Sequence, residues 1–276
     1  MTEVFESNAA ANASTAQHLR ESLGLKEVLI YARIDSTNAQ AIRSLKAGQA
    51  CPFLVLGRRQ TAGKGRRGRV WESPAGAGLY YSLVLELPGE ARDLAALSLV
   101  TAISVQAALR ELGVRGLNLK WPNDILSDGR KLSGILLESQ FRSGTQYLVI
   151  GIGVNLNLPE QLKANLERPA TDLTALGAHA VDPDQLALTI SRYLIENVYR
   201  FMESGFAVFQ SEWNSLDAYM GQPIEVELGD SVVTGEMQGV NELGELCLLT
   251  DQGQEVVRGG EVFPTVRPSL AVGANP

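Results

Sequence analysis

The stretch RRQTAGKGRRGRVW, residues 58–71, combines six basic side chains with three glycines and contains no acidic residue. The whole chain has 276 residues and a formal net charge of −7, so this basic run stands in an otherwise acidic protein. Glycine lets backbone N–H groups come close to an anion, and arginine binds phosphate oxygens through two parallel N–H groups. The stretch therefore predicts a loop that holds a ligand carrying phosphate.

The centre of this stretch, GKGRRG at residues 63–68, matches the G-x-G-x-x-G pattern of dinucleotide-binding folds, but its surroundings do not. That fold needs a strand before the glycines and a helix directly after them. Residues 52–59 predict the strand, whereas Pro74 and a second predicted strand at 78–88 follow the loop. We therefore exclude a Rossmann fold. A Walker A loop is excluded because no Gly-Lys pair at the required spacing precedes Ser or Thr.

Strands and helices are predicted on both sides of the loop, since apolar β-branched runs predict strands and capped apolar periodicity predicts helices. The predicted strands are 27–34, 52–59, 78–88, 130–141 and 146–159, and the last two form an antiparallel pair. The stretch 117–126 predicts a further strand that runs into a proline turn. The predicted helices are 39–47, 93–112, 182–205 and 206–218, with Asp93 near the start of the second. The helix at 93–112 is apolar on nearly all sides, which predicts that it is buried.

From residues 219–222 onward, the sequence pattern changes to short predicted strands that are separated by Gly-Asp and Asp-Gln-Gly turns. Such regular spacing predicts a small all-β barrel. We divide the chain into an extension at 1–26, a main domain at 27–219, a C-terminal domain at 220–268 and a tail at 269–276. The first dozen or so residues are polar and rich in alanine, and we expect them to be loosely held.

Composition narrows the classes of protein. With 45% apolar and 20% charged residues, the chain is typical of a soluble globular protein. It has neither a secretory signal nor an apolar run of bilayer length, which predicts a cytoplasmic location with Cys51 and Cys247 reduced. Neither His18 nor His179 lies in a stretch that predicts a general base, and the sequence has neither a G-x-S-x-G motif nor a Cys–His pairing. Chemistry would therefore rest on charge stabilisation by lysine and arginine.

Three further stretches carry polar residues beside glycines: KWPNDIL at 120–126, GRKLSGILLE at 129–138 and GIGVN at 151–155. Asn123 and Asp124 either form an Asx turn or face a ligand, with Asp124 holding Mg²⁺ or orienting an arginine. The glycines on two neighbouring strands leave room for a ligand on the sheet. These stretches predict a slot that is floored by backbone.

Four motifs in order resemble the biotin–protein ligase family, also called biotin–[acetyl-CoA-carboxylase] ligases. They are DSTN at 35–38, the basic loop with its following strand at 58–85, KWPNDILSDGRKLSGILLE at 120–138 and GIGVNLN at 151–157. The resemblance implies an α+β fold, in which a class II synthetase-like mixed sheet with flanking helices is followed by an SH3-like C-terminal β-barrel. Only 26 residues precede Glu27, too few for a three-helix DNA-binding domain. The enzyme-only form without DNA binding is therefore expected.

The resemblance also implies roles for individual residues. Biotin binding is implied for Ser36, Thr37, Asn38, Gln60, Gly63, Lys64, Gly65, Arg66, Lys131, Gly134 and Gly153. ATP binding is implied for Arg66, Arg69, Trp71, Asn123, Asp124 and Lys131; Lys131 and Arg66 are the implied catalytic residues and Asp124 the implied Mg²⁺ ligand. Many relatives carry arginine at the position of Lys64, and lysine keeps the charge but loses the two-pronged geometry.

The implied reaction uses ATP with Mg²⁺ to convert biotin to biotinyl-5′-AMP, and then transfers biotin to a lysine of the biotin carboxyl carrier protein of acetyl-CoA carboxylase. No tightly bound prosthetic group and no membrane partner are expected, and a homodimer is possible. A lipoate–protein ligase or octanoyltransferase on the same scaffold is the nearest alternative. A non-enzymatic nucleic-acid binder that uses residues 58–71 is a second alternative, which the acidic remainder of the chain disfavours.

Overall fold

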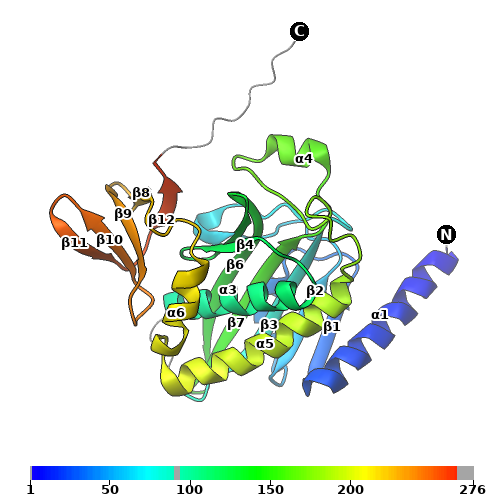
Figure 1. Cartoon of the computed structure of the whole chain (residues 1–276). Helices are drawn as coiled ribbons and strands as arrows, with labels where there is room; N and C mark the ends of the chain where they lie inside the picture. The colour runs from blue at the N-terminus through cyan, green and yellow to red at the C-terminus, as the bar shows by residue number, and fades with distance from the viewer. Residues whose placement is uncertain (1, 90–93, 266–276) are drawn as a thin grey trace, which may run out of the picture.

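The computed structural model describes residues 2–89 and 94–265 and contains a seven-stranded mixed sheet and a five-stranded antiparallel sheet (Figure 1). The strand order of the large sheet is β1-β2-β3-β7-β6-β5-β4. The β1–β2 pair is parallel, and the other neighbouring pairs are antiparallel. The predicted α+β class, with a mixed sheet, flanking helices and a separate C-terminal β-structure, is confirmed.

The described residues form twelve strands and six α-helices. The strands of the large sheet are β1 (Glu27–Tyr31), β2 (Phe53–Gly57), β3 (Gly78–Glu86), β4 (Leu117–Lys120), β5 (Asp124–Ser127), β6 (Arg130–Arg142) and β7 (Thr145–Asn155). The α-helices are α1 (Thr2–Leu23), α2 (Thr37–Lys46), α3 (Leu94–Glu111), α4 (Glu160–Asn165), α5 (Pro183–Ser204) and α6 (Ala207–Leu216). The small sheet consists of β8 (Pro223–Glu227), β9 (Val232–Val240), β10 (Leu246–Thr250), β11 (Gly253–Val257) and β12 (Glu261–Pro264).

Side chains that alternate along the buried strands form a separate core on each face of the large sheet. In β2, Leu54 and Leu56 belong to the core that includes α3 and α5, whereas Phe53 and Val55 pack in the core with α2. This alternation is what a strand with both faces covered requires. Figure 1 shows α3 and α5 lying across the front of the sheet. The candidate site described below lies on the opposite face, beside α2.

The stretch 117–126 contains the predicted strand and proline turn, but a second strand, which the sequence analysis does not predict, follows the turn. The two strands are β4 and β5, which pair antiparallel with each other and are separated by a turn at Trp121–Asn123. Proline lacks a backbone donor, so Pro122 favours a chain reversal over a continuous central strand. The turn brings Asp124 opposite Lys120 in the register of the two strands.

The start of the chain, for which the sequence analysis predicts no helix, forms α1 from Thr2 to Leu23. Alanine is the best helix former, and this stretch is rich in it. Leu19 is fully buried in the main core, and Arg58 joins Asn12 of α1 to Asp184 of α5 through hydrogen bonds. The predicted helix start at Asp93 and the predicted tail at 269–276 lie outside the described residues.

The small sheet, with strand order β11-β10-β9-β8-β12, contacts the large one near β4. The indole Nε1 of Trp121 donates a hydrogen bond to the carbonyl of Gly244 at 3.2 Å. The ring of Phe263 in β12 lies against the ammonium of Lys120 and the guanidinium of Arg168. These contacts place β12 next to the end of β4 and to Arg168. In the parts of the chain that the structure describes, no helix has the length and apolarity needed to cross a membrane.

Candidate active site

Two adjoining cavities lie on the α2 face of the large sheet. The smaller has a volume of about 50 Å³ and the larger about 540 Å³. Both are lined by Gly65, Arg66, Trp71, Asn123 and Lys131. Only the smaller is lined by residues of the α2 start and of Gln60, and only the larger reaches segment 158–170 and β12. The site therefore has two ends that meet at shared residues.

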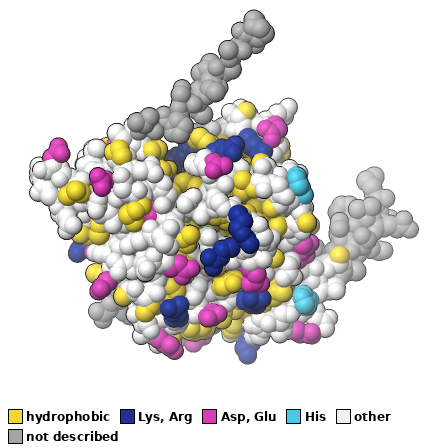
Figure 2. All heavy atoms as spheres, viewed as in Figure 1, with side chains coloured by type: hydrophobic (Ala, Val, Ile, Leu, Met, Phe, Trp, Pro, Cys, Tyr) yellow, Lys and Arg dark blue, Asp and Glu magenta, His cyan; other side chains and the backbone are white. Residues whose placement is uncertain are grey.

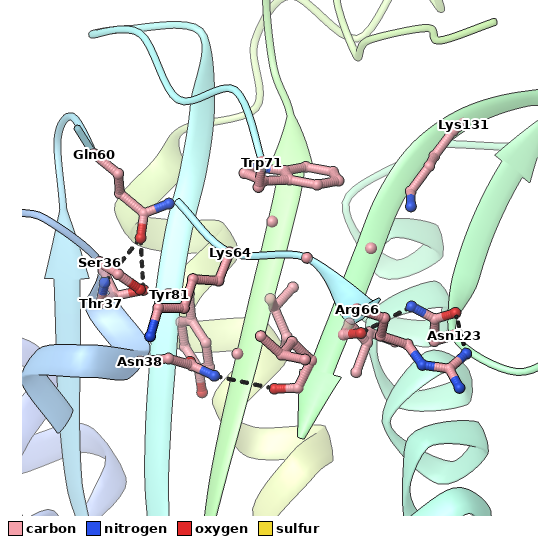
Figure 3. A pocket seen from close by; sticks show the side chains of 17 residues that line it. Ser36, Thr37, Asn38, Gln60, Lys64, Arg66, Trp71, Tyr81, Asn123 and Lys131 are labelled. Carbon is pink, nitrogen blue, oxygen red and sulfur yellow. Dashed lines mark hydrogen bonds between the residues drawn. The ribbon is translucent and has the colours of Figure 1, made fainter. Parts of the chain in front are cut away.

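At the end near α2, called the neutral end, the lining side chains other than Lys64 of the loop are uncharged, and they are hydrogen-bonded within the protein (Figure 3). Ser36 caps α2, because its Oγ accepts from the Ala39 N–H. The Gln60 Oε1 accepts hydrogen bonds from the backbone N–H and the Oγ1 of Thr37, at 2.8 and 3.2 Å. The Gln60 Nε2 donates to the Oγ of Ser73 at 2.9 Å. The orientation of the Gln60 amide is thus fixed before any ligand binds.

Asn38 is held from three sides and is only 3% exposed. Its Oδ1 lies 2.5 Å from the Oγ of Ser82, and its Nδ2 donates to the Glu138 Oε2 at 2.8 Å and to the Leu136 carbonyl at 3.3 Å. A side chain at Gly151 would overlap the Asn38 carboxamide. Asn38 therefore shapes the wall of the small cavity while its own hydrogen-bonding groups are already engaged.

The indole of Trp71 covers part of the glycine floor (Figure 3). A Cβ atom at Gly134 would come within 2.9 Å of the ring, and one at Gly153 would overlap it. The Nζ of Lys131 lies 5.3 Å from the ring centroid, which is within cation–π range. The absence of side chains at the two glycines thus lets Trp71 form the wall between the two cavities.

The meeting point of the cavities is charged. The Nζ of Lys131 lies 2.6 Å from Oδ1 of Asp124, which is 6% exposed. The Arg66 guanidinium donates to Oδ1 of Asn123 at 3.1 Å, and the Asn123 Nδ2 donates to the Ile135 carbonyl. Burial lowers the pKa of Arg66, and the neighbouring Arg67 lowers it further. Two cations are therefore positioned where the neutral cavity opens into the larger one.

At the far end of the larger cavity, the carboxylate of Glu261 in β12 lies among three arginines, two from the loop and one from segment 158–170. Arg69 donates to both carboxylate oxygens, Arg168 donates to Oε1, and Arg67 lies 3.9 Å away. Burial alone would raise the pKa of Glu261, but the hydrogen bonds from Arg69 and Arg168 hold it well below its usual range. The C-terminal sheet thus supplies an internal anion to the basic loop.

Most residues predicted for the site line these cavities. The small cavity is lined by Ser36, Thr37, Asn38, Gln60, Lys64, Gly65, Arg66, Trp71, Asn123, Lys131, Gly134 and Gly153, and the large one adds Arg69 and Asp124. Gly63 lines neither; it packs against Ser73 and Gln60, where a side chain would clash. Arg58, which has no role in the sequence analysis, forms an ion pair with Asp184.

Sequence reasoning missed several residues around the site. Tyr81 and Leu136 line the small cavity, and segment 158–170 and Glu261 line the large one. Alternation in the strands would have shown that Ser82 shares a face with the glycines, but the partners in β12 carry no local signal. On the face seen in Figure 2, acidic and basic side chains are interspersed in small groups. Several cations of residues 58–71 have specific partners within the protein.

Comparisons with known proteins show which family the chain is similar to. The profile of the Biotin/lipoate A/B protein ligase family matches residues 30–155, and that of the Biotin protein ligase C terminal domain matches residues 219–263. The biotin–[acetyl-CoA-carboxylase] ligase of Paracoccus denitrificans is 38% identical over 84% of this chain and 98% of its own length. The bifunctional ligase/repressor BirA of Escherichia coli is 34% identical over 85% of this chain and 73% of its own length.

A solved structure is similar as well. The biotin protein ligase from Aquifex aeolicus, in complex with biotin and ATP, superposes with a TM-score of 0.74 and 33% identity, covering 86% of this chain and 98% of that one. Sequence similarity at this level extends over both the large sheet and the C-terminal sheet. The chain therefore belongs to the biotin protein ligase family.

Proposed function

We propose that this protein activates biotin with ATP, forming biotinyl-5′-AMP and pyrophosphate, and then transfers biotin to a lysine of an acceptor protein. The observation that carries this proposal is a neutral, prearranged cavity that opens between Lys131 and Arg66 into a larger cavity rich in arginine. The relative from Aquifex aeolicus, which is 33% identical, holds biotin and ATP together. A ring with amide-like groups suits the neutral end, and phosphates suit the charged end.

At the neutral end, we assign recognition of the ureido ring of biotin to Ser36, Thr37, Asn38 and Gln60, with the backbone of Gly65, Gly134 and Gly153 as the floor. Buried polar groups that hydrogen-bond a ligand reject analogues that lack the matching groups. Asn38 acts chiefly through its fixed position, since its amide is engaged by Ser82 and Glu138. Lys64 and Gly63 hold the loop over this end.

At the charged end, we assign the reacting phosphate to Lys131 and Arg66, which line both cavities. The carboxylate of biotin attacks the α-phosphate of ATP, and pyrophosphate leaves. Fixed cations at the point where charge accumulates lower the barrier without reorganisation. Arg69, Trp71 and Asn123 line the nucleotide side.

Magnesium enters this proposal as the ion that accompanies ATP. Magnesium sites use one or two carboxylates together with substrate phosphates. Here the carboxylate of Asp124 is taken by Lys131, and the described residues contain no cluster of three or more metal-binding side chains. In this resting arrangement the Asp124 carboxylate is engaged by Lys131, and no step is routed through Asp124 as a metal ligand.

In the second step, the lysine of an acceptor attacks the mixed anhydride and AMP leaves. Exclusion of water by the loop at residues 63–71 would protect the anhydride. We propose the biotin carboxyl carrier protein of acetyl-CoA carboxylase as the acceptor, in keeping with the name of the Paracoccus relative. Residues 27–219 would form the catalytic domain and residues 220–268 a C-terminal domain that closes the nucleotide side.

A homodimer in the cytoplasm fits the same proposal. Strand β6 runs from Arg130 to Arg142, but β5 pairs only with residues 130–134. Among the described strands none pairs with the rest of that edge, on which Phe141 is 64% exposed. An uncovered edge of this length can extend the sheet into a second copy of the chain. Sedimentation of the purified protein with and without biotin and ATP tests this part.

The function is tested by ATP–pyrophosphate exchange with the purified chain. We expect exchange that depends on biotin and is not supported by lipoate or octanoate, followed by labelling of a carrier domain with biotin. Exchange driven equally well by lipoate would instead favour the lipoate–protein ligase alternative. Absence of exchange with all three acids would contradict the proposal, and salt-resistant binding to nucleic acid would then favour the other class.

A further inference from the structure

Lys120 is a buried lysine to which the proposed reaction gives no role. It is the last residue of β4 and is 8% exposed. In the β4–β5 register it lies opposite Asp124, and Asp124 lies opposite Gly134 on β6. Antiparallel partners project to the same face of a sheet. Lys120 therefore extends the row of residues that floors the site.

Among residues 2–89 and 94–265, the ammonium of Lys120 has no hydrogen-bond acceptor and no carboxylate within 4.0 Å. Its Nζ lies over the ring of Phe263, 5.2 Å from the ring centroid. An aromatic face is a weaker partner for an ammonium than a carboxylate is. Burial lowers the pKa of Lys120, while the carboxylates of Asp124 and Glu261 oppose that shift. A cation kept in this position calls for an anion that it can reach.

Asp124 is the anion whose partner has to change. Its carboxylate is paired with Lys131 at 2.6 Å. The proposed reaction requires the Lys131 Nζ to move to the biotin carboxylate and the α-phosphate. Removing one partner of a buried ion pair leaves an uncompensated charge, which is strongly unfavourable. The departure of Lys131 would therefore oppose catalysis unless another cation replaced it.

The other cations near Asp124 already have partners. Arg66 donates to Asn123, and Arg69 and Arg168 donate to Glu261. Lys120 is the neighbouring cation whose donors are unused, and it shares a face of the sheet with Asp124. Its long side chain can change rotamer without moving the strand.

We propose that Lys120 is a positioning residue that takes over the carboxylate of Asp124 when Lys131 engages the substrates. The exchange lets Lys131 leave its resting ion pair without stranding a buried negative charge. This inference rests on the proposed function. It gives Lys120 no contact with biotin or with ATP.

The test is a double-mutant cycle measured by biotin-dependent ATP–pyrophosphate exchange, with Lys120→Met, Asp124→Asn and the double variant. We expect Lys120→Met to lower kcat by about ten- to a hundredfold, the range of coupling between contacting residues, with the KM values for biotin and ATP unchanged. In the Asp124→Asn background the same substitution should have no further effect. Lys120→Arg should recover part of kcat, and Lys46→Met on the exposed side of α2 serves as the matched control.

Three results would overturn the inference. Multiplicative losses in the double variant would show that Lys120 acts independently of Asp124. A rise in the KM for ATP equal to the fall in kcat/KM would show direct contact with phosphate. A lowered Tm in Lys120→Met, with activity lost equally in both backgrounds, would show a packing role against Phe263. If the wild-type protein shows no biotin-dependent exchange, the proposed function itself fails, whatever the variants do.

Discussion

The buried polar groups at the two ends of the site are satisfied by different kinds of partner. At the neutral end, the uncharged side chains of Thr37, Asn38 and Gln60 are satisfied by hydrogen bonds to one another and to their neighbours. At the charged end, the carboxylates of Asp124 and Glu261 form ion pairs with the cations that would otherwise face a ligand. The neutral end is thus ready to bind as it stands, whereas the charged end has to exchange partners. Substitutions at the two ends should therefore fail in different measurements.

The largest effect is expected at the charged end, from Lys131→Ala and Arg66→Ala. Each removes a cation at the junction of the cavities, and loss of one preorganised donor costs about 10²–10³-fold in rate. We expect this loss in biotin-dependent pyrophosphate exchange, with biotin affinity changed much less. Exchange within threefold of the wild-type rate in either variant would remove the basis for assigning the charged end to phosphate chemistry.

A smaller effect, of a different kind, is expected at the neutral end from Asn38→Ala. The substitution removes the carboxamide that shapes the wall of the small cavity and leaves Ser82 and Glu138 without their shared partner. The unsatisfied groups, at about 1–3 kcal/mol each, destabilise the free protein and the complex alike, so the weaker binding comes from the altered wall. Biotin should bind about ten- to a hundredfold more weakly by titration calorimetry, while the KM for ATP stays the same. Asn118→Ala on the exposed side of β4 is the control. A matching loss of ATP affinity would mean that the two ends are not separate.

The internal anion of the charged end is tested by Glu261→Gln. Allowing for the partial exposure of its arginine partners, we expect a loss of about 1–2 kcal/mol in the free energy of unfolding. Because the pKa of Glu261 is depressed in the folded protein, its contribution is complete above the ordinary glutamate pKa. The contribution is lost as the pH falls below that value. The wild type and the variant should therefore differ in urea unfolding at pH 7 and converge on acidification, and a constant difference would contradict this account.

The sequence predicted the neutral end better than the charged end, for a physical reason. Ser36, Thr37 and Asn38 sit where a strand meets a helix cap, and glycines at alternate strand positions indicate a floor. Such signals are local. The partners of Arg58 and Arg69 lie 126 and 192 residues away, and no local pattern points to Asp184 or Glu261.

The same reason accounts for the two elements of the fold that the sequence did not predict. The proline turn after Lys120 was visible, but whether β5 begins a new strand depends on its pairing with β6. The helix α1 depends on packing of Leu19 and on the ion pair between Arg58 and Asp184, which joins three distant segments. Tertiary contacts decided both elements, and propensity alone did not.

The smallest effect is expected from Lys64→Arg, at the loop residue that faces the neutral end. Lys64 lines the small cavity but is exposed, so a gain in two-pronged geometry is worth at most about 1 kcal/mol, or roughly fivefold. We expect slower release of biotinyl-5′-AMP in a filter assay, with the rate of its formation unchanged. Arg59→Lys, an exposed position outside both cavities, controls for a general change in the basic loop. Faster release from Lys64→Arg would show that lysine, rather than arginine, is the better residue over this pocket.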